Sequence, residues 1–339
     1  MTLLKRIALA ALCFTAAVSC KSTKTLLPNV SGKAGEVIVV MDKEVWEGTA
    51  GEEVRSLLGG ACPYLPQREA LYTLVNIAPG AFTDLFKIHR NIVFFNIDAQ
   101  NDTSGVFFRY DVWAKPQTVV QISAYDDNSA KELVQQNGKL ISAAIEQAER
   151  DRVINNTLLY EEKSIALKVR EVFGGSPHFP MGYKIRKATD DFIWIADDKQ
   201  YVYQDVLIYK YKAEKDHPFT SDNIISHRNE VMKNNVPGMV ENSYMTTSEF
   251  FPPMIEYQKY KGRHFVQTRG MWEVKNDFMG GPFVSHSFYS PDGQDIIVAE
   301  AFVYAPRYDK RQYLRQVESL LYSWEWVEKD GEKDGSEGK

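Results

Sequence analysis

The sequence predicts an α+β protein made of two similar mixed modules, with mainly antiparallel sheets and long amphipathic helices. Short runs rich in β-branched and aromatic residues alternate with helical patterns along the whole chain. Each half contains a long helix whose apolar residues share one face. Hydrophobic residues make up 44% of the chain and charged residues 25%, as in ordinary globular proteins. Each module could be a ferredoxin-like sandwich.

The first module is expected over residues 36–155. Its clearest element is a helix over 128–152, which begins at Asn128-Ser129 near capping spacing. A shorter helix over 50–58 is closed by Gly59-Gly60. A further short helix is expected within 82–89, and strands are expected over 36–42, 70–78, 91–98, 105–113 and 118–125.

The second module is expected over residues 156–327. A helix over 157–173 stops at Gly174-Gly175, and a closing helix over 309–325 carries its apolar residues on one face. Pro291-Asp292-Gly293 is a strong hairpin signal. The remaining expected elements are a helix over 220–234 and strands over 183–188, 191–196, 201–212, 263–274, 282–290 and 295–305.

Two segments suggest an internal duplication. FTDLFKIHRN at 82–91 and FTSDNIISHRN at 219–229 share Phe-Thr, an Asp and a terminal His-Arg-Asn, with one gap. Alternatively, each His-Arg-Asn marks the end of a helix, where His and Arg favour the helix dipole and Asn tolerates the left-handed conformation.

The N-terminus has the pattern of an export signal. Lys5 and Arg6 precede twelve mostly apolar residues, too few to cross a bilayer, and small residues then lead into Cys20. This pattern resembles the bacterial lipobox, although Ala17 stands where Leu is usual. We therefore expect 1–19 to be a lipoprotein signal peptide, Cys20 to be the lipidated first residue and 20–35 to be a tether. The alternative is an ordinary signal peptide.

Cysteine usage then leaves one thiol. With Cys13 in the signal peptide and Cys20 lipidated, only Cys62 remains, so neither an internal disulfide nor a cysteine zinc site is expected. Residues 328–339 form a charged, glycine-rich tail that we expect to be disordered.

Several function classes lack their sequence signatures. A net charge of −5 argues against nucleic-acid binding, which favours a basic surface. The six histidines show no helical zinc pair, and no nucleophile elbow, phosphate-binding loop or dinucleotide motif occurs. We therefore expect no metal and no cofactor, and the sequence assigns no catalytic residue.

Three stretches combine unusual residue types: 31–48, the proline-rich 63–69, and 267–286, which contains Gly280-Gly281-Pro282. Glycines beside aromatic residues allow close approach of a ligand, a partner or another strand. The alternative for the third stretch is a bulged hairpin turn beside a core tryptophan. The candidate binding residues are Trp46, Arg90, Arg269 and Trp272.

These features together suggest a family. The lipobox and the segments LLPNVSGKAGEVIVVMDKEVWEG, LPQRE, HRNIV and RGMWEVKNDFMGGPFV resemble a family of Bacteroidetes lipoproteins known as domain of unknown function 4837. The resemblance covers nearly the whole chain after the signal peptide. It implies an exported, lipid-anchored envelope protein and brings no catalytic residues. Lys21 and Lys24 stand where a surface-export signal would be acidic, which favours the periplasmic face of the outer membrane.

Two functions remain open. The first is a non-enzymatic binding or scaffold module in the periplasm, which holds an envelope protein or a glycan. The second is a glycan hydrolase of the envelope that uses a pair of carboxylates about 5–10 Å apart, flanked by Trp or Tyr. A flat aromatic patch would favour the first function, and a cleft with two suitable carboxylates would favour the second.

Overall fold

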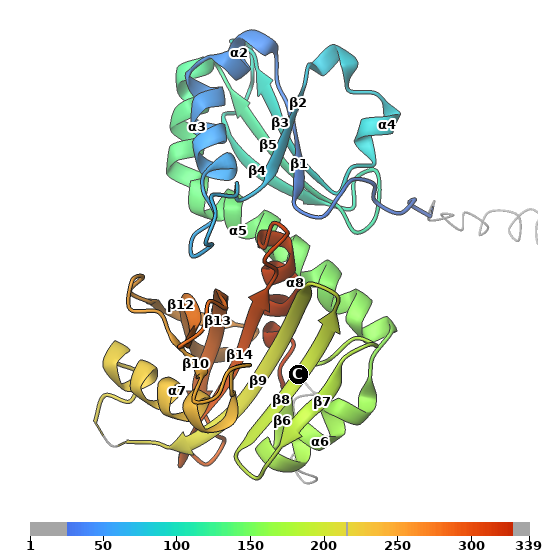
Figure 1. Ribbon diagram of the computed structural model, residues 1–339. Helices are drawn as coiled ribbons and strands as arrows, with labels where there is room; N and C mark the ends of the chain where they lie inside the picture. Colours follow the sequence, from blue (N-terminus) through green and yellow to red (C-terminus); the bar gives the residue numbers. More distant parts are fainter. Residues whose placement is uncertain (1–25, 215, 328–339) are drawn as a thin grey trace, which may run out of the picture.

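The computed structural model describes residues 26–214 and 216–327, which form two modules stacked along one long helix (Figure 1). The expected signal peptide, Cys20, the beginning of the tether and the charged tail lie outside the described residues. Among the residues described, no helix is both long and apolar enough to cross a membrane.

The first module contains a five-stranded, mostly parallel sheet. In spatial order its strands are β2 (Thr73–Ile77), β1 (Glu36–Val40), β3 (Asn91–Ile97), β5 (Thr118–Ala124) and β4 (Gly105–Tyr110). Only β4 runs antiparallel to its neighbour. The central strands β1 and β3 are buried on both faces, which explains their continuous apolar runs.

Helices cover one face of this sheet and aromatic side chains cover the other. On one face, α3 (Thr49–Gly59) and α5 (Asp127–Leu159) bury their apolar stripes against the strands. The other face lies under a segment that contains η2 (Pro79–Ala81) and α4 (Asp84–Lys87), with Phe82 packed edge-on against Trp113. The short helix α2 (Lys43–Glu47) leads from β1 into α3.

Helix α5 connects the two modules. It begins with a capping box in which the Ser129 amide donates to the Asp126 carboxylate at 2.7 Å. No proline interrupts it, and the helix continues past the expected end at 152 and crosses the expected boundary at 155. Its C-terminal half lies beside the second module, where Gln147 donates to the Tyr260 hydroxyl at 3.1 Å.

The second module contains a fully antiparallel eight-stranded sheet. Along the sheet lie β10 (Tyr244–Thr247), β12 (Arg263–Lys275), β13 (Gly280–Tyr289), β14 (Asp295–Tyr304), β9 (Val202–Lys212), β8 (Phe192–Lys199) and β7 (Lys184–Ala188). Strand β11 (Met254–Tyr260) also pairs with β12, beyond the end of β10. A small separate sheet pairs β6 (Gly175–Ser176) with β15 (Glu325–Trp326).

Helices cover both faces of the eight-stranded sheet. On one face α6 (Lys163–Phe173) and α8 (Arg311–Tyr322) pack on β8, β9, β13 and β14 around a large apolar core. On the other face α7 (Ser221–Asn235) packs over β10, β12 and β14. Most strand positions are therefore buried, and side chains on both faces of the sheet contribute to a core.

The α+β class, the two modules and the mainly antiparallel strands are confirmed. The expected similarity between the modules, and with it the ferredoxin-like alternative, is not found. One sheet has five mostly parallel strands and the other has eight antiparallel strands. The runs VIVV and IVFF are the physical reason, because unbroken apolar runs are typical of parallel strands buried on both faces.

The two His-Arg-Asn segments lie in different structures. The first follows the end of α4 and leads into β3, as a helix end should. The second lies in the middle of α7, where Arg228 is fully buried. The helix-end interpretation is therefore wrong for the second segment, since Arg228 points into the core.

Candidate functional site: an aromatic groove

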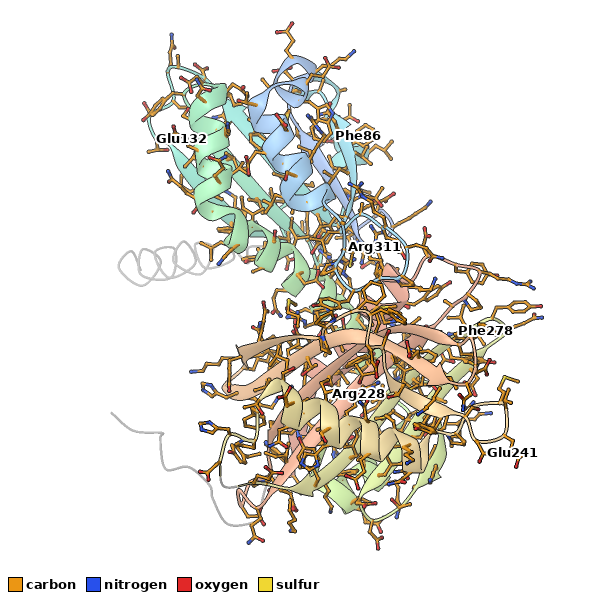
Figure 2. The ribbon with its side chains drawn as sticks, turned by 60° about the vertical axis from the view of Figure 1, so that its left-hand side comes forward. Phe86, Glu132, Arg228, Glu241, Phe278 and Arg311 are labelled. Atoms are coloured by element: carbon orange, nitrogen blue, oxygen red, sulfur yellow. The ribbon has the colours of Figure 1, made fainter. Side chains whose placement is uncertain are left out.

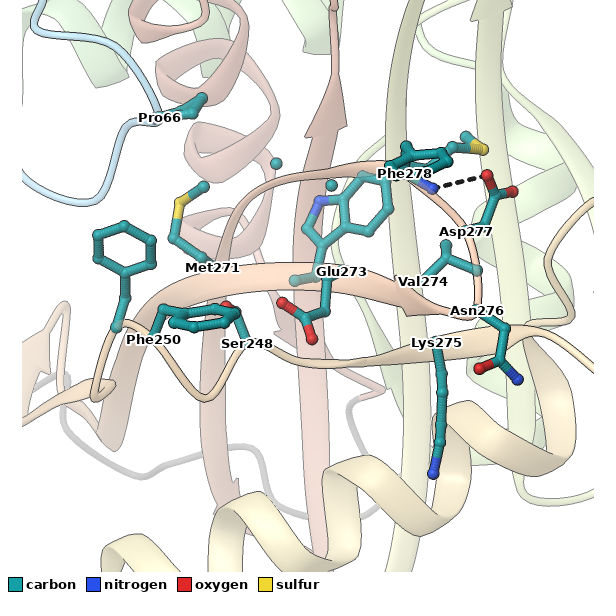
Figure 3. Close-up of a pocket in the computed structure, with 15 residues that line it drawn as sticks. Pro66, Ser248, Phe250, Met271, Glu273, Val274, Lys275, Asn276, Asp277 and Phe278 are labelled. Carbon is teal, nitrogen blue, oxygen red and sulfur yellow. Dashed lines mark hydrogen bonds between the residues drawn. The ribbon is translucent and has the colours of Figure 1, made fainter.

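A groove of about 860 Å³ opens where the loop 63–69 of the first module approaches the second module (Figure 3). Its walls are the β12–β13 hairpin and the connection between β10 and β11. The Tyr64 hydroxyl donates to the Pro252 carbonyl at 3.0 Å and so ties the loop to that connection. The groove thus brings together the second and third unusual stretches of the sequence.

The rim of the groove carries three exposed phenylalanines. Phe250 is 82% exposed and Phe278 is fully exposed, while Phe251 is about half exposed. Figure 2 shows Phe278 extending outward from the edge of the second module. Pro252 and Pro253 directly follow Phe250-Phe251. Because prolines lack amide donors, this segment cannot continue as a paired strand.

The floor of the groove is Trp272, which is only 2% exposed. Its indole N–H donates to the Val303 carbonyl at 3.3 Å, and its ring meets Phe302 edge-on. A Cβ at Gly281 would lie 2.1 Å from the Val303 carbonyl. The glycine therefore permits close strand packing, and Trp272 supports the groove from beneath. The expected core tryptophan is found, but Gly280-Gly281-Pro282 lie in β13, paired in regular register with β12, and not in a bulged turn.

Charged side chains stand at the hairpin end of the groove. Glu273, Lys275 and Asp277 line it, and the Asp277 carboxylate accepts a hydrogen bond from the Phe278 amide at 2.6 Å. Asn276 occupies the left-handed region at φ 64°, which turns the hairpin and projects Phe278. Apolar anchors with a mixed-charge rim are typical of protein–protein interfaces.

The other sequence candidates lie elsewhere. Trp46 is half-buried on α2, where its ring lies under the Arg55 guanidinium at 4.9 Å and packs on the first core. Arg90 lies 3.2 Å from the Glu149 carboxylate in a pocket between the modules. Arg269 forms an ion pair with Glu318 in another pocket. The four candidates are thus not brought together in one site.

Two carboxylates line each of several pockets, and in one of about 320 Å³ Glu146 and Glu318 line the wall together with Cys62. Burial alone would raise the pKa of Glu146, but the charge and hydrogen bonds of Arg315 outweigh it and lower that pKa. Tyr72 donates a further hydrogen bond at 2.6 Å. Glu146 is therefore held ionised and is unsuited to act as a general acid.

The same pocket offers no activated nucleophile. Burial raises the pKa of the Cys62 thiol, so the thiol stays protonated near neutral pH. Across residues 26–214 and 216–327, no group of three or more His, Cys, Asp or Glu side chains could hold a metal ion.

Sequence reasoning missed the rim phenylalanines. Phe278 lies inside the stretch 267–286, in which only Arg269 and Trp272 were candidate binding residues. The available signal was Phe250-Phe251 directly before Pro252-Pro253, an apolar pair in a segment that cannot form a central strand.

Solved structures share only limited likeness with the chain. The Ran-binding protein Mog1p of Saccharomyces cerevisiae matches with 8% identity and a TM-score of 0.31, over 45% of this chain and 90% of that one. A point mutant of the protein Mog1 gives 8% identity, a TM-score of 0.30 and coverage of 45% and 91%. A Bacteroides thetaiotaomicron protein matches with 12% identity and a TM-score of 0.21, over 47% of each chain. No curated protein matches the chain.

Family comparisons divide the chain as the fold does. Residues 30–158 match domain of unknown function 8532, and residues 162–323 match domain of unknown function 4837. The expected resemblance to the second family over nearly the whole chain is thus confirmed for the second module alone. The change from one family to the other falls between α5 and α6. The chain therefore carries a DUF8532 domain followed by a DUF4837 domain.

Proposed function

We propose that this chain is a non-enzymatic binding module of the bacterial cell envelope that holds a protein partner in the aromatic groove. In this proposal a lipid on Cys20 anchors it to the periplasmic face of the outer membrane. The exposed Phe250 and Phe278 above the buried Trp272 are the observation that carries the binding role. Contiguous exposed apolar side chains around a groove mark interaction surfaces.

A protein partner fits the groove better than a glycan. Phenylalanine has no polar group to pair with sugar hydroxyls, whereas apolar anchors inserted in pockets dominate protein interfaces. The adjacent β11 pairs only with β12 among the described strands, so its other edge has open backbone groups. We expect an extended partner segment to pair with this edge and to place apolar side chains in the groove.

The hydrolase alternative receives less support. Several pockets are lined by two carboxylates, and one of them places Asp151 and Glu325 beside Tyr260, Tyr322 and Trp324. In the pocket that holds Glu146 and Glu318, each carboxylate pairs with an arginine, and Tyr72 is the only aromatic residue of the lining. A glycosidase needs one carboxyl group that stays protonated to donate to the leaving group. The ion pair lowers the pKa of Glu146, which opposes that role.

Site-specific photo-crosslinking tests the groove. A photoreactive phenylalanine analogue at position 278, in the lipidated chain in its own membranes, should give one defined protein adduct. The matched control places the analogue at Leu85, an apolar position on α4 of the first module that is 71% exposed. The variant Phe250→Ser should reduce the adduct at position 278. The same adduct from position 85, or a yield that Phe250→Ser leaves unchanged, contradicts the proposal.

The anchoring part has a separate test. Cys20→Ala should move the protein from the sedimented envelope fraction into the soluble fraction, because the acyl chains would be lost. A variant that still sediments with membranes would show that lipid on Cys20 is not what retains the protein.

A further inference from the structure

A second, polar pocket of about 410 Å³ lies between the two modules. The segment around Ala34 and Arg90 contributes from the first module, α5 contributes Glu149 and Asn156, and α8 contributes Gln312 from the second module's side. Pockets of about 300–1,000 Å³ at domain junctions are common sites for small molecules. This pocket is separate from the aromatic groove and shares no lining residue with it.

The pocket has an excess of one positive charge. Arg90, Arg152 and Lys199 line it together with Glu149 and Asp197. Lys199 is neutralised by Asp197, with 2.6 Å between the ammonium nitrogen and the carboxylate oxygen. Two guanidinium groups therefore share the single carboxylate of Glu149.

Arg152 uses its donors within the protein. Its guanidinium donates to the Glu149 carboxylate at 3.0 Å and to the Asn91 side chain at 3.0 Å. It also donates to the backbone carbonyls of Pro116 and Arg90, at 3.0 and 2.7 Å. Three of these bonds join α5 to Asn91 on β3 and to the segments before β3 and β5, which makes Arg152 a structural residue.

Arg90 is the cation left for a ligand. Its Nε lies 3.2 Å from the nearer Glu149 oxygen, yet this nitrogen makes no hydrogen bond within the described residues although it is fully enclosed. The enclosed Nε lies against Glu149, so a ligand in the pocket would meet the terminal nitrogens of this guanidinium, which make no hydrogen bond within the described residues.

The remaining lining suits hydroxyl groups. The side-chain carbonyl of Gln312 is enclosed and lacks a donor within residues 26–214 and 216–327. Gln204 donates to the Tyr313 carbonyl at 2.9 Å, which leaves its own side-chain oxygen available to accept. Asn156 and Tyr183 add an amide and a phenol to the wall. Several amide groups together with one arginine match a molecule that bears several hydroxyls and one anionic group.

We infer that this pocket binds a sugar acid, with the ligand carboxylate paired to Arg90 and the ligand hydroxyls paired to Gln312 and the neighbouring amides. The single excess positive charge matches a carboxylate monoanion. A phosphate dianion would leave one negative charge uncompensated beside Glu149 and Asp197. The ligand is either a free uronic acid or the uronic acid residue at the end of a glycan chain.

Calorimetric titration of the purified chain with glucuronate tests this inference. Glucuronate should bind with at least about tenfold higher affinity than glucose, and Arg90→Met should remove at least about tenfold of that affinity. Arg109→Met is the matched control, since Arg109 is an exposed arginine on β4 outside the pocket, and it should bind normally. Gln312→Leu, on α8, should also weaken binding without changing the arginine.

Each remaining outcome decides the inference. An oligosaccharide that ends in glucuronate and binds as well as the monomer identifies a glycan end, and binding of the monomer alone identifies a free sugar acid. No binding at about millimolar glucuronate, equal binding of glucose, or wild-type affinity in Arg90→Met overturns the proposal. Tighter binding of inorganic phosphate than of glucuronate would also overturn it.

Discussion

The segments His89-Arg90-Asn91 and His227-Arg228-Asn229 have the same three residues, and in each the arginine lies beside a buried glutamate. The second segment lies within α7 and the first lies before β3. The second arginine has all its charge neutralised inside one module, whereas the first faces a pocket between modules. The comparison shows that a short motif specifies a buried ion pair only together with the element that carries it.

In the second module the motif joins a helix to a sheet. Arg228 donates two hydrogen bonds to Glu300 on β14, at 2.9 and 2.7 Å, and one to Thr247 on β10 at 2.8 Å. Asn229 accepts from the Thr247 amide and hydroxyl. Figure 2 shows Arg228 on the inner side of α7, beneath the sheet. Here arginine, glutamate and asparagine form one satisfied polar cluster.

In the first module two residues, Asn91 and Arg152, together make the contacts to the buried glutamate that Arg228 makes in the second module. Asn91 donates to Glu149 at 2.7 Å and to the Glu36 carbonyl at 2.9 Å, and so joins β3 to α5 and β1. Arg152, three residues after Glu149 on α5, supplies the aligned ion pair that Arg228 supplies in the other module. Arg90 is therefore not needed for the hydrogen bonds of the cluster.

The largest expected effect is at Arg228. Arg228→Ala should lower the free energy of unfolding by about 3–5 kcal/mol, because it leaves the Glu300 charge buried and unpaired. Burial already raises the pKa of Glu300 against the opposing charge of Arg228. Urea unfolding at pH 7 measures the loss. Arg228→Met combined with Glu300→Leu should recover most of it, and a double variant as unstable as the single one would refute the leftover charge as the cause.

Asp205 is a buried acid that forms no hydrogen bond with an arginine among the described residues. Asp205 is buried on β9, where burial raises its pKa to about 7 and the Trp194 indole donates one hydrogen bond at 2.7 Å. The folded state holds the proton more tightly than the unfolded state, so this group destabilises the fold as pH rises from about 4 to about 7. The loss is about 1.4 kcal/mol per pH unit at most.

Asp205→Asn should therefore be more stable than the wild type at pH 8, by up to about 4 kcal/mol, and similar at pH 4. Asparagine keeps an oxygen that can accept from the Trp194 indole, so the packing is retained. Thermal unfolding of both proteins across this pH range gives the difference. A difference that does not change with pH would mean that Asp205 does not titrate in this range.

A smaller effect is expected at Arg152. Arg152→Met removes four hydrogen bonds but leaves Glu149 beside Arg90 and Asn91, so the cost should be about 2 kcal/mol and below that of Arg228→Ala. Urea unfolding under the same conditions compares the two variants. A larger loss for Arg152→Met than for Arg228→Ala would contradict the view that Glu149 keeps other partners while Glu300 depends on Arg228.

Local sequence patterns were enough to predict most elements of the fold. Helix 50–58 and the presence of α5 agree with the structure because periodicity acts over a few residues. The cap of α5 is Asp126, with Ser129 as its reciprocal partner, and not the expected Asn128-Ser129. The parallel pairing in the first sheet was not predicted, since pairing of β1 with β3 depends on segments about fifty residues apart. The continued path of α5 beside α8 depends on the second module, which a local pattern does not include.

The candidate site was predictable only in part. The stretches 63–69 and 267–286 were singled out separately, and only the fold brings them to one groove. Exposure separates Phe278 from Trp272, and exposure depends on which side of a hairpin faces solvent. Arg90 was named as a candidate from the sequence, yet its availability for a ligand depends on Arg152, which forms the aligned hydrogen bond to Glu149 and also donates to the Arg90 carbonyl.

The smallest expected effect separates the two motif arginines most clearly. Arg90→Met should change the free energy of unfolding by about 1 kcal/mol or less, because Arg152 and Asn91 keep their hydrogen bonds to Glu149. Urea unfolding of Arg90→Met beside Arg228→Ala gives the ratio directly. A loss as large as that of Arg228→Ala would show that both arginines are structural, and the polar pocket would then lack an available cation. A small loss would show that Arg90 is not needed for stability and is available to a ligand in the polar pocket.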